Sequence, residues 1–77
     1  MVKAYVLVQA SVGKIPEVAE ALRAMPSTLS CDDVTGPYDV IVQVQVEAIE
    51  ELGQLVAAQI QTIEGITRTV TCPVVNY

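Results

Sequence analysis

Four side chains capable of acid-base chemistry fall close together, between residues 32 and 39. They are the carboxylates of Asp32, Asp33 and Asp39 and the hydroxyl of Tyr38. Carboxylates become useful acids or bases at neutral pH only where their surroundings shift the pKa. The chain has no histidine, which removes the commonest general base. We therefore expect no catalytic constellation.

Metal and redox chemistry have equally little support. Cys31 and Cys72 lie too far apart in the sequence to form a CxxC pair. The missing histidine also removes the commonest transition-metal ligand. We expect no metal site and no cofactor, and both cysteines should be inert, half-buried apolar residues.

The charge balance argues against nucleic acid as a direct partner. Nine acidic and four basic residues give a net charge of -5. Phosphate backbones are bound by clustered Lys and Arg, whereas the basic residues here are scattered. No stretch approaches the roughly 20 apolar residues of a membrane span, and no leader is evident. The expectation is a cytoplasmic protein that does not contact a membrane.

The residues capable of chemistry must be positioned by regular elements, which the hydrophobic pattern predicts. Strict alternation over 2–10 and 39–46 is typical of strands, and the polar segment 27–34 favours a weaker edge strand. Helical spacing predicts one helix from about Ile15 to Met25 and another from about Ala48 to Thr62. A last strand is expected over 66–75, where Pro73 favours a sheet edge.

This order, βαββαβ, predicts an α+β, ferredoxin-like fold over residues 1–77 as one domain. Two helices should cover one face of an antiparallel four-stranded sheet, with the first and third strands central. Cys31 and Cys72 would then lie on opposite edges, roughly 14 Å apart. A disulfide allows roughly 7 Å between Cα atoms, so we expect no intrachain bridge.

The composition suggests self-association, because 52% of the residues are hydrophobic in a chain of 77. So small a core cannot hide that much apolar surface. On the face of the sheet turned away from the helices we expect Tyr5 and Leu7, with Ile41 and Gln43 on the neighbouring strand. These four residues are the predicted dimer interface.

Four segments in this order resemble the ligand-binding domain of the Lrp/AsnC family of amino-acid-responsive transcriptional regulators. They are VLVQASVGKIPEVAEALRAMP, VTGPYDVIVQVQV, EAIEELGQLVAAQIQTIEGI and TRTVTCPVV. Full-length members carry a helix-turn-helix DNA-binding domain, whereas here Met1 leads into the first strand. The resemblance therefore implies a stand-alone effector-binding domain of the RAM type. It also implies homodimers that pack sheet against sheet, as in dimeric α+β barrels, and assemble into rings.

By the same resemblance, two segments would hold a small effector, an amino acid in family members. One is the loop Thr35-Gly36-Pro37-Tyr38-Asp39, and the other is the threonine run Thr67, Thr69 and Thr71. Asp39 could accept a charge-assisted hydrogen bond from an ammonium group. The plainer interpretations are a tight hairpin turn and simple β-propensity.

Three functions remain open from the sequence. The first is a small-effector sensor that acts through self-association or by joining a full-length Lrp/AsnC regulator. The second is a cofactor-free enzyme of the dimeric α+β barrel type, which would rely on Asp32, Asp33, Asp39 and Tyr38. The third is an oligomerisation domain without a ligand. We expect the first, and no enzyme.

Overall fold

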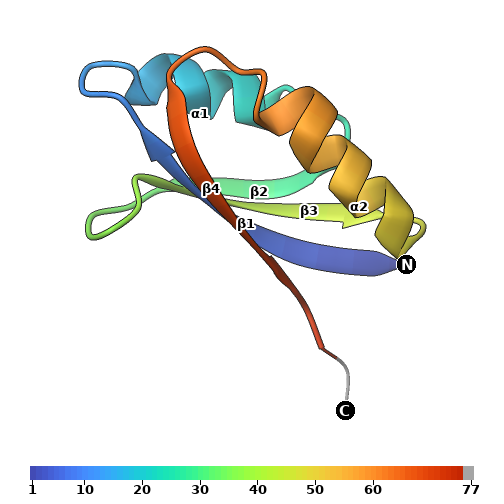
Figure 1. Cartoon of the computed structure of the whole chain (residues 1–77). Helices are drawn as coiled ribbons and strands as arrows, with labels where there is room; N and C mark the ends of the chain where they lie inside the picture. The colour runs from blue at the N-terminus through green and yellow to red at the C-terminus, as the bar shows by residue number, and fades with distance from the viewer. Residues whose placement is uncertain (76–77) are drawn as a thin grey trace.

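The computed structural model describes residues 1–75 of the chain. Its elements follow the order β1 (Val2–Ala10), α1 (Ile15–Arg23), β2 (Thr28–Asp33), β3 (Val40–Val46), α2 (Ile49–Leu55), the π-helix η1 (Val56–Ile60) and β4 (Ile66–Pro73). Both helices lie on the same side of one curved sheet (Figure 1). None of the helices in the described part combines the length and hydrophobicity that crossing a membrane would need.

The sheet is antiparallel, with strand order β2-β3-β1-β4. The two most hydrophobic strands, β1 and β3, are central and pair directly, with Val6 opposite Val42. The polar strand β2 and the proline-ending strand β4 form the edges. The ferredoxin-like prediction is therefore confirmed, including the strand order.

One side of each central strand builds the core. The core residues alternate along β1 and β3 and meet the inner faces of the helices: Ala4, Val6, Val8, Val18, Ala19, Leu22, Val40, Val42, Val44, Val46, Leu52, Leu55 and Ile60. Period-2 alternation sends the intervening side chains to the opposite face, which no helix of the described chain covers. The sheet therefore presents one covered face and one open face.

The second helical segment differs from the regular helix expected over 48–62. An α-helix ends at Leu55 and a π-helical stretch continues to Ile60. Gln61 N–H donates to the carbonyl of Val56 at 2.8 Å, which is the i to i−5 bond of a π-turn. Ile60, the last residue of this stretch, is fully buried.

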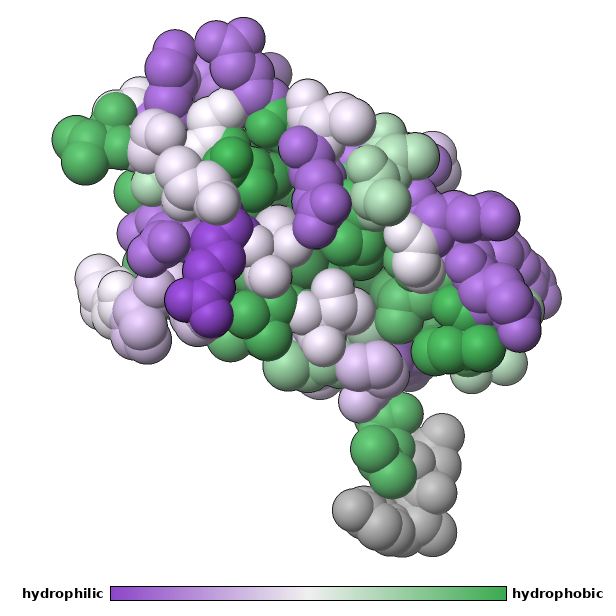
Figure 2. Space-filling view, viewed as in Figure 1, coloured by the Kyte–Doolittle hydropathy of each residue, from purple (hydrophilic) through white to green (hydrophobic). Residues whose placement is uncertain are grey.

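The first turn of α2 is acidic on its outer side. Glu50 and Glu51 lie there, and both are exposed. Hydrophilic side chains gather over this part of the surface, beside smaller hydrophobic areas (Figure 2). Negative charge at this position is favourable, because the amino end of a helix carries a partial positive charge.

The cysteines lie on opposite edge strands and both are free thiols. Cys31 is half-buried against α1, where its thiol lies 3.9 Å from the carbonyl oxygen of Ala19. Cys72 differs from the expectation, because its side chain is exposed. It pairs with Tyr5 of β1 and alternation therefore places it on the open face.

Candidate functional site

The loop between β2 and β3 is held to the end of β1 by Asp39. Its Oδ2 accepts a hydrogen bond from the backbone N–H of Ala10 at 2.9 Å. Its own N–H donates to the carbonyl of Val8, also at 2.9 Å, and its carbonyl accepts from Val34 N–H. One carboxylate oxygen of Asp39 thus has a structural role, as the hairpin interpretation proposed.

The rest of the loop is open to solvent. Thr35, Gly36 and Pro37 are exposed, whereas Tyr38 is half-buried. Gly36 has φ +125°, and a Cβ there would meet nothing within 4 Å. The backbone at Gly36 is therefore accessible to a ligand from outside, in a conformation that side-chain-bearing residues rarely adopt.

Gln9 connects this loop to β4. Its Nε2 donates to the carbonyl of Pro37 at 3.5 Å, a long contact. The Thr67 hydroxyl donates to the backbone carbonyl of Gln9 at 3.1 Å. The structure therefore brings Thr67 and the 35–39 loop to the same end of the sheet, with Gln9 between them.

Thr69 and Thr71 lie elsewhere. They pair with Val8 and Val6, whose side chains are in the core, so both threonines face the helices. Thr69 accepts a hydrogen bond from Gln61 Nε2 at 3.2 Å. Thr71 borders a shallow apolar groove beside α2. Of the three predicted threonines, the described structure brings only Thr67 to the loop.

The predicted interface residues form one patch on the open face. Tyr5 lies opposite Gln43, and Leu7 lies opposite Ile41. Across the next strand pair, Val70 lies beside Leu7. Tyr5 is 44% exposed although it carries a large aromatic ring. Apolar side chains thus occupy the middle of a face that the chain itself does not cover.

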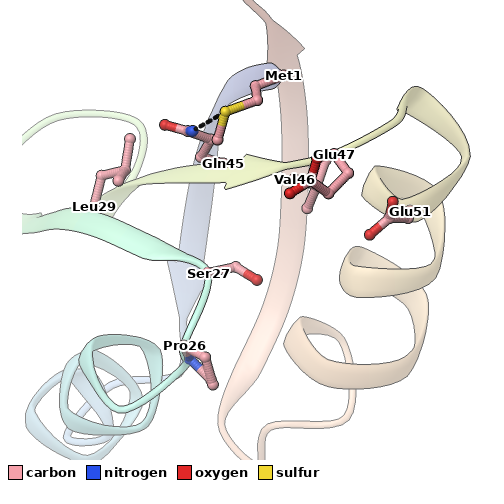
Figure 3. Close-up of a pocket in the computed structure, with 8 residues that line it drawn as sticks. All are labelled: Met1, Pro26, Ser27, Leu29, Gln45, Val46, Glu47 and Glu51. Carbon is pink, nitrogen blue, oxygen red and sulfur yellow. Dashed lines mark hydrogen bonds between the residues drawn. The ribbon is translucent and has the colours of Figure 1, made fainter.

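A separate pocket of about 360 Å³ opens at the other end of β3 (Figure 3). Its lining residues are Met1, Pro26, Ser27, Leu29, Gln45, Val46, Glu47 and Glu51. The Gln45 side-chain amide points at the sulfur of Met1, 3.1 Å away. Two carboxylates make this pocket unfavourable for a ligand with a free carboxylate.

Two side chains of β2, Cys31 and Asp33, interact with α1. Burial raises the pKa of the Cys31 thiol above its ordinary value, against a smaller opposite effect of Arg23. The Arg23 guanidinium also lies 3.6 Å from Asp33, and both side chains are more than half exposed. Among residues 1–75, no group of three or more Cys, Asp or Glu side chains is arranged to hold a metal ion.

Three residues near these sites were not predicted from the sequence. They are Gln9, which contacts the loop, and Val70 and Cys72, which lie on the open face. Val70 and Cys72 alternate with the threonines of β4, so period 2 would have assigned them to the opposite face. Gln9 had a weaker signal, as a polar residue at the end of a strand directly before a turn. Its position between Pro37 and Thr67 depends on strand pairing, which no local pattern indicates.

The sequence model of the family described as the Lrp/AsnC ligand binding domain matches residues 3–76, nearly the whole chain. The chain belongs to this family. Among curated relatives, the helix-turn-helix-type transcriptional regulator FL11 of Pyrococcus furiosus is 32% identical over 68 residues. An uncharacterised regulator of the same type from Pyrococcus horikoshii, PH0140, has the same identity over the same length.

The alignments cover 88% of this chain but only 44% of FL11 and 43% of PH0140. This Lrp/AsnC domain therefore spans less than half the length of those regulators. The part of the chain that they share with it lies within the match to the Lrp/AsnC ligand binding domain.

Solved structures show the same fold at full length. TTHA0845 from Thermus thermophilus superposes with a TM-score of 0.94 and 31% identity, covering 100% of this chain and 96% of that one. The hypothetical protein PHS023 from Pyrococcus horikoshii gives 0.91, with 34% identity and coverage of 100% and 93%. Solved chains of this size thus share the architecture in Figure 1.

Proposed function

We propose that this Lrp/AsnC domain, residues 1–77 as one unit, binds a small effector and self-associates. Binding and assembly would be coupled, because an effector that binds one assembly more tightly stabilises that assembly. The setting would be cytoplasmic, and a full-length Lrp/AsnC regulator would supply the contact with DNA.

The observation that carries the proposal is the open sheet face. Leu7, Ile41 and Val70 lie side by side on it, with Tyr5 and Gln43 adjoining them. A second copy placed on this face would remove those apolar groups from water, which favours association. The resulting sheet-on-sheet dimer would bury apolar side chains on the second face of the sheet, which one chain leaves exposed.

The proposed effector site is the exposed loop Thr35–Pro37 together with Gln9 and Thr67. The accessible backbone at Gly36 and the side-chain amide of Gln9 offer both donors and acceptors. The second oxygen of Asp39 remains available for a cation. Amino acids are the first class to test, since they carry an ammonium and a carboxylate within a few ångströms of each other.

A structure of the Neisseria meningitidis regulator NMB0573 was solved as an L-Met complex. Its identity to this chain is 21%, so the likeness supports the fold alone. L-Met therefore enters the test only as one member of a panel of amino acids.

Titration calorimetry with that panel, paired with analytical ultracentrifugation, tests the proposal. Thr67→Val should weaken binding, because it removes the hydroxyl at the loop end of β4. Thr69→Val is the matched control, since its side chain pairs with Gln61 on the helix side. Absence of binding for every amino acid, with no change in assembly, would reject the sensing role.

A purely structural oligomerisation domain is the second candidate. It is favoured by the internal hydrogen bonds of Asp39, which hold the loop without any ligand. Ultracentrifugation would then detect the assembly while calorimetry detects no ligand. The two candidates differ only in that second measurement.

A further inference from the structure

The outer edge of β4 presents backbone groups that no other strand of the sheet pairs with. β4 is the last strand of the sheet and has β1 as its neighbour on one side only. The N–H of Val74 donates to a carbonyl of β1 at 2.8 Å, and the hydrogen-bonding direction alternates along a strand. Cys72 and Val70 therefore face β1, whereas the N–H and C=O groups of Thr69 and Thr71 point outward.

This edge has few of the features that usually prevent a strand from being added. Exposed edges are commonly blocked by lysine, proline or inward-pointing charge. The segment from Thr69 to Thr71 has none of these, and Pro73 limits pairing only at the end of the strand. Among residues 1–75, neither threonine makes a backbone hydrogen bond outside the ladder with β1. The edge can therefore accept another strand.

An apolar groove of about 450 Å³ lies beside the same edge, between β4 and the second helical segment. Ile49, Leu52, Val56 and Ala57 line it from the helical side, and Thr71 lines it from β4. Hydrophobic surface is visible between β4 and the hydrophilic outer side of α2 (Figure 2). The groove opens on the helix side of the sheet, so it is separate from the open face proposed for self-association.

An added antiparallel strand would direct its side chains in a defined order. The residue opposite Thr71 would exchange both backbone hydrogen bonds with it and would point to the same side of the sheet, into the groove. An aliphatic side chain at this position would leave water for an apolar surface. The next residue on that side would lie opposite Thr69, beside the amide of Gln61.

The charge at one end of the groove favours a cationic side chain in the added strand. Gln61 donates to Thr69, so α2 begins toward the Pro73 end of β4. Ile49 lines the groove there, and the exposed carboxylate of Glu50 follows it in the first turn of α2. A lysine or arginine opposite Pro73 would be attracted by this carboxylate and by the net charge of -5.

The edge strands of a second copy match the groove poorly. The side chains that β4 directs to the helix side are Thr69 and Thr71, which are polar. On β2 they include Asp33, whose charge Glu50 would repel. The groove therefore fits a strand with a different side-chain pattern from either edge of this chain.

We infer that the β4 edge and the adjoining groove bind an extended segment of another protein by strand addition. The segment carries an aliphatic residue that enters the groove and a lysine or arginine two residues before it. Backbone pairing with Thr69 and Thr71 supplies an attraction common to many sequences, while the groove and Glu50 select among them. Neither an effector nor the open face takes part.

A synthetic peptide, Ac-Thr-Lys-Thr-Ile-Thr-Gln-Thr-NH2, is the probe for this inference. Its isoleucine would lie opposite Thr71 and its lysine opposite Pro73. By amide exchange in NMR spectra, the N–H groups of Thr69 and Thr71 should exchange about ten-fold more slowly at saturating peptide. Replacing the isoleucine by serine should raise the Kd about ten-fold. Replacing the lysine by glutamate should raise it about three-fold at low salt.

Two variants of the chain test the groove and the edge separately. Gly53→Leu should fill the groove and raise the Kd about ten-fold, and a Cβ at this position meets nothing within 4 Å. Gln54→Leu adds the same side chain to α2 on the side facing β2, so it is the matched control. Thr71→Pro removes the outward N–H and should abolish binding, whereas Thr71→Val keeps that N–H and should bind normally.

Far-ultraviolet circular dichroism checks that each variant is folded, and Gly53→Leu decides alone if Thr71→Pro is not. Binding that is unchanged in Gly53→Leu would overturn the inference, as would no binding at millimolar peptide. Protection of amides elsewhere, with none at Thr69 and Thr71, would also overturn it. Protection of these two amides that rises with protein concentration in the absence of peptide would identify a second copy as the occupant and contradict the inference.

Discussion

Asp39, directly before β3, accepts a hydrogen bond from the backbone N–H of Ala10 at the end of β1, 2.9 Å away. The bond joins residues 29 positions apart and fixes the candidate effector loop to the central strand. Asp39, which the sequence predicts to bind a ligand, therefore has a structural role that does not depend on a ligand.

Asp39→Ala should lower the free energy of unfolding by about 1–3 kcal/mol, because it leaves the part-buried Ala10 amide without its partner. Asp39→Asn retains an acceptor oxygen and should lose less. Urea denaturation followed by circular dichroism measures both. Equal stability of the alanine variant and the original chain would show that solvent replaces this bond.

Leu7→Ala and Val6→Ala should have different consequences, although the two residues are adjacent. Val6 is fully buried under the helices, so its truncation should destabilise the folded chain by about 2 kcal/mol. Leu7 lies on the open face opposite Ile41, so its truncation should mainly weaken self-association. Denaturation at low concentration and ultracentrifugation separate the two effects.

If Leu7→Ala destabilises the monomer as much as Val6→Ala, the open face contributes to the fold of one chain. Ile41→Ala provides a second test from the neighbouring strand. Its effect on assembly should match that of Leu7→Ala, because the two side chains lie in the same row.

Gly65→Ala should destabilise the fold by about 1–3 kcal/mol. Gly65 has φ +102°, and a Cβ would lie 2.9 Å from Cβ of Lys14 and 3.1 Å from Cγ2 of Val18. Gly53→Ala is the control, since a Cβ within α2 would meet nothing within 4 Å. Better helix propensity should make that variant more stable by about 0.5–1 kcal/mol. Thermal melts of the pair give the sign of each change.

Cys31 should react slowly with thiol reagents at neutral pH. Desolvation raises its pKa above the ordinary thiol value, which lowers the reactive thiolate fraction. In a Cys72→Ser background, the rate with Ellman's reagent should rise with pH and increase sharply on unfolding in urea. The Cys31→Ser variant reports the reactivity of Cys72 alone.

The same shift has a defined effect on stability. A thiol whose pKa is higher in the folded state favours the unfolded state once the pH exceeds the unfolded pKa, because the unfolded chain then releases the proton more readily. Above that pH, the free energy of unfolding should fall for the original chain more than for Cys31→Ser. An identical pH dependence of the two would contradict the burial of this thiol.

Hydrophobic periodicity was enough to predict the element order, the central strands and which side chains of β1 and β3 enter the core. These features depend on local alternation, which needs no knowledge of distant residues. Val40, Val42 and Val44 alternate with Ile41 and Gln43 in the printed sequence as they do in the sheet. Family resemblance added the location of the candidate loop.

The contacts between particular polar residues could not be predicted from hydrophobic periodicity. Asp39 reaches Ala10, Gln9 reaches Pro37, and Thr67 rather than Thr69 or Thr71 lies beside them. The register shift between Gln9 and Ala10 sets that end of β4, and no local pattern encodes it. Asp32 and Arg68 face the same open side for the same physical reason: pairing between distant strands assigns the neighbours across a sheet.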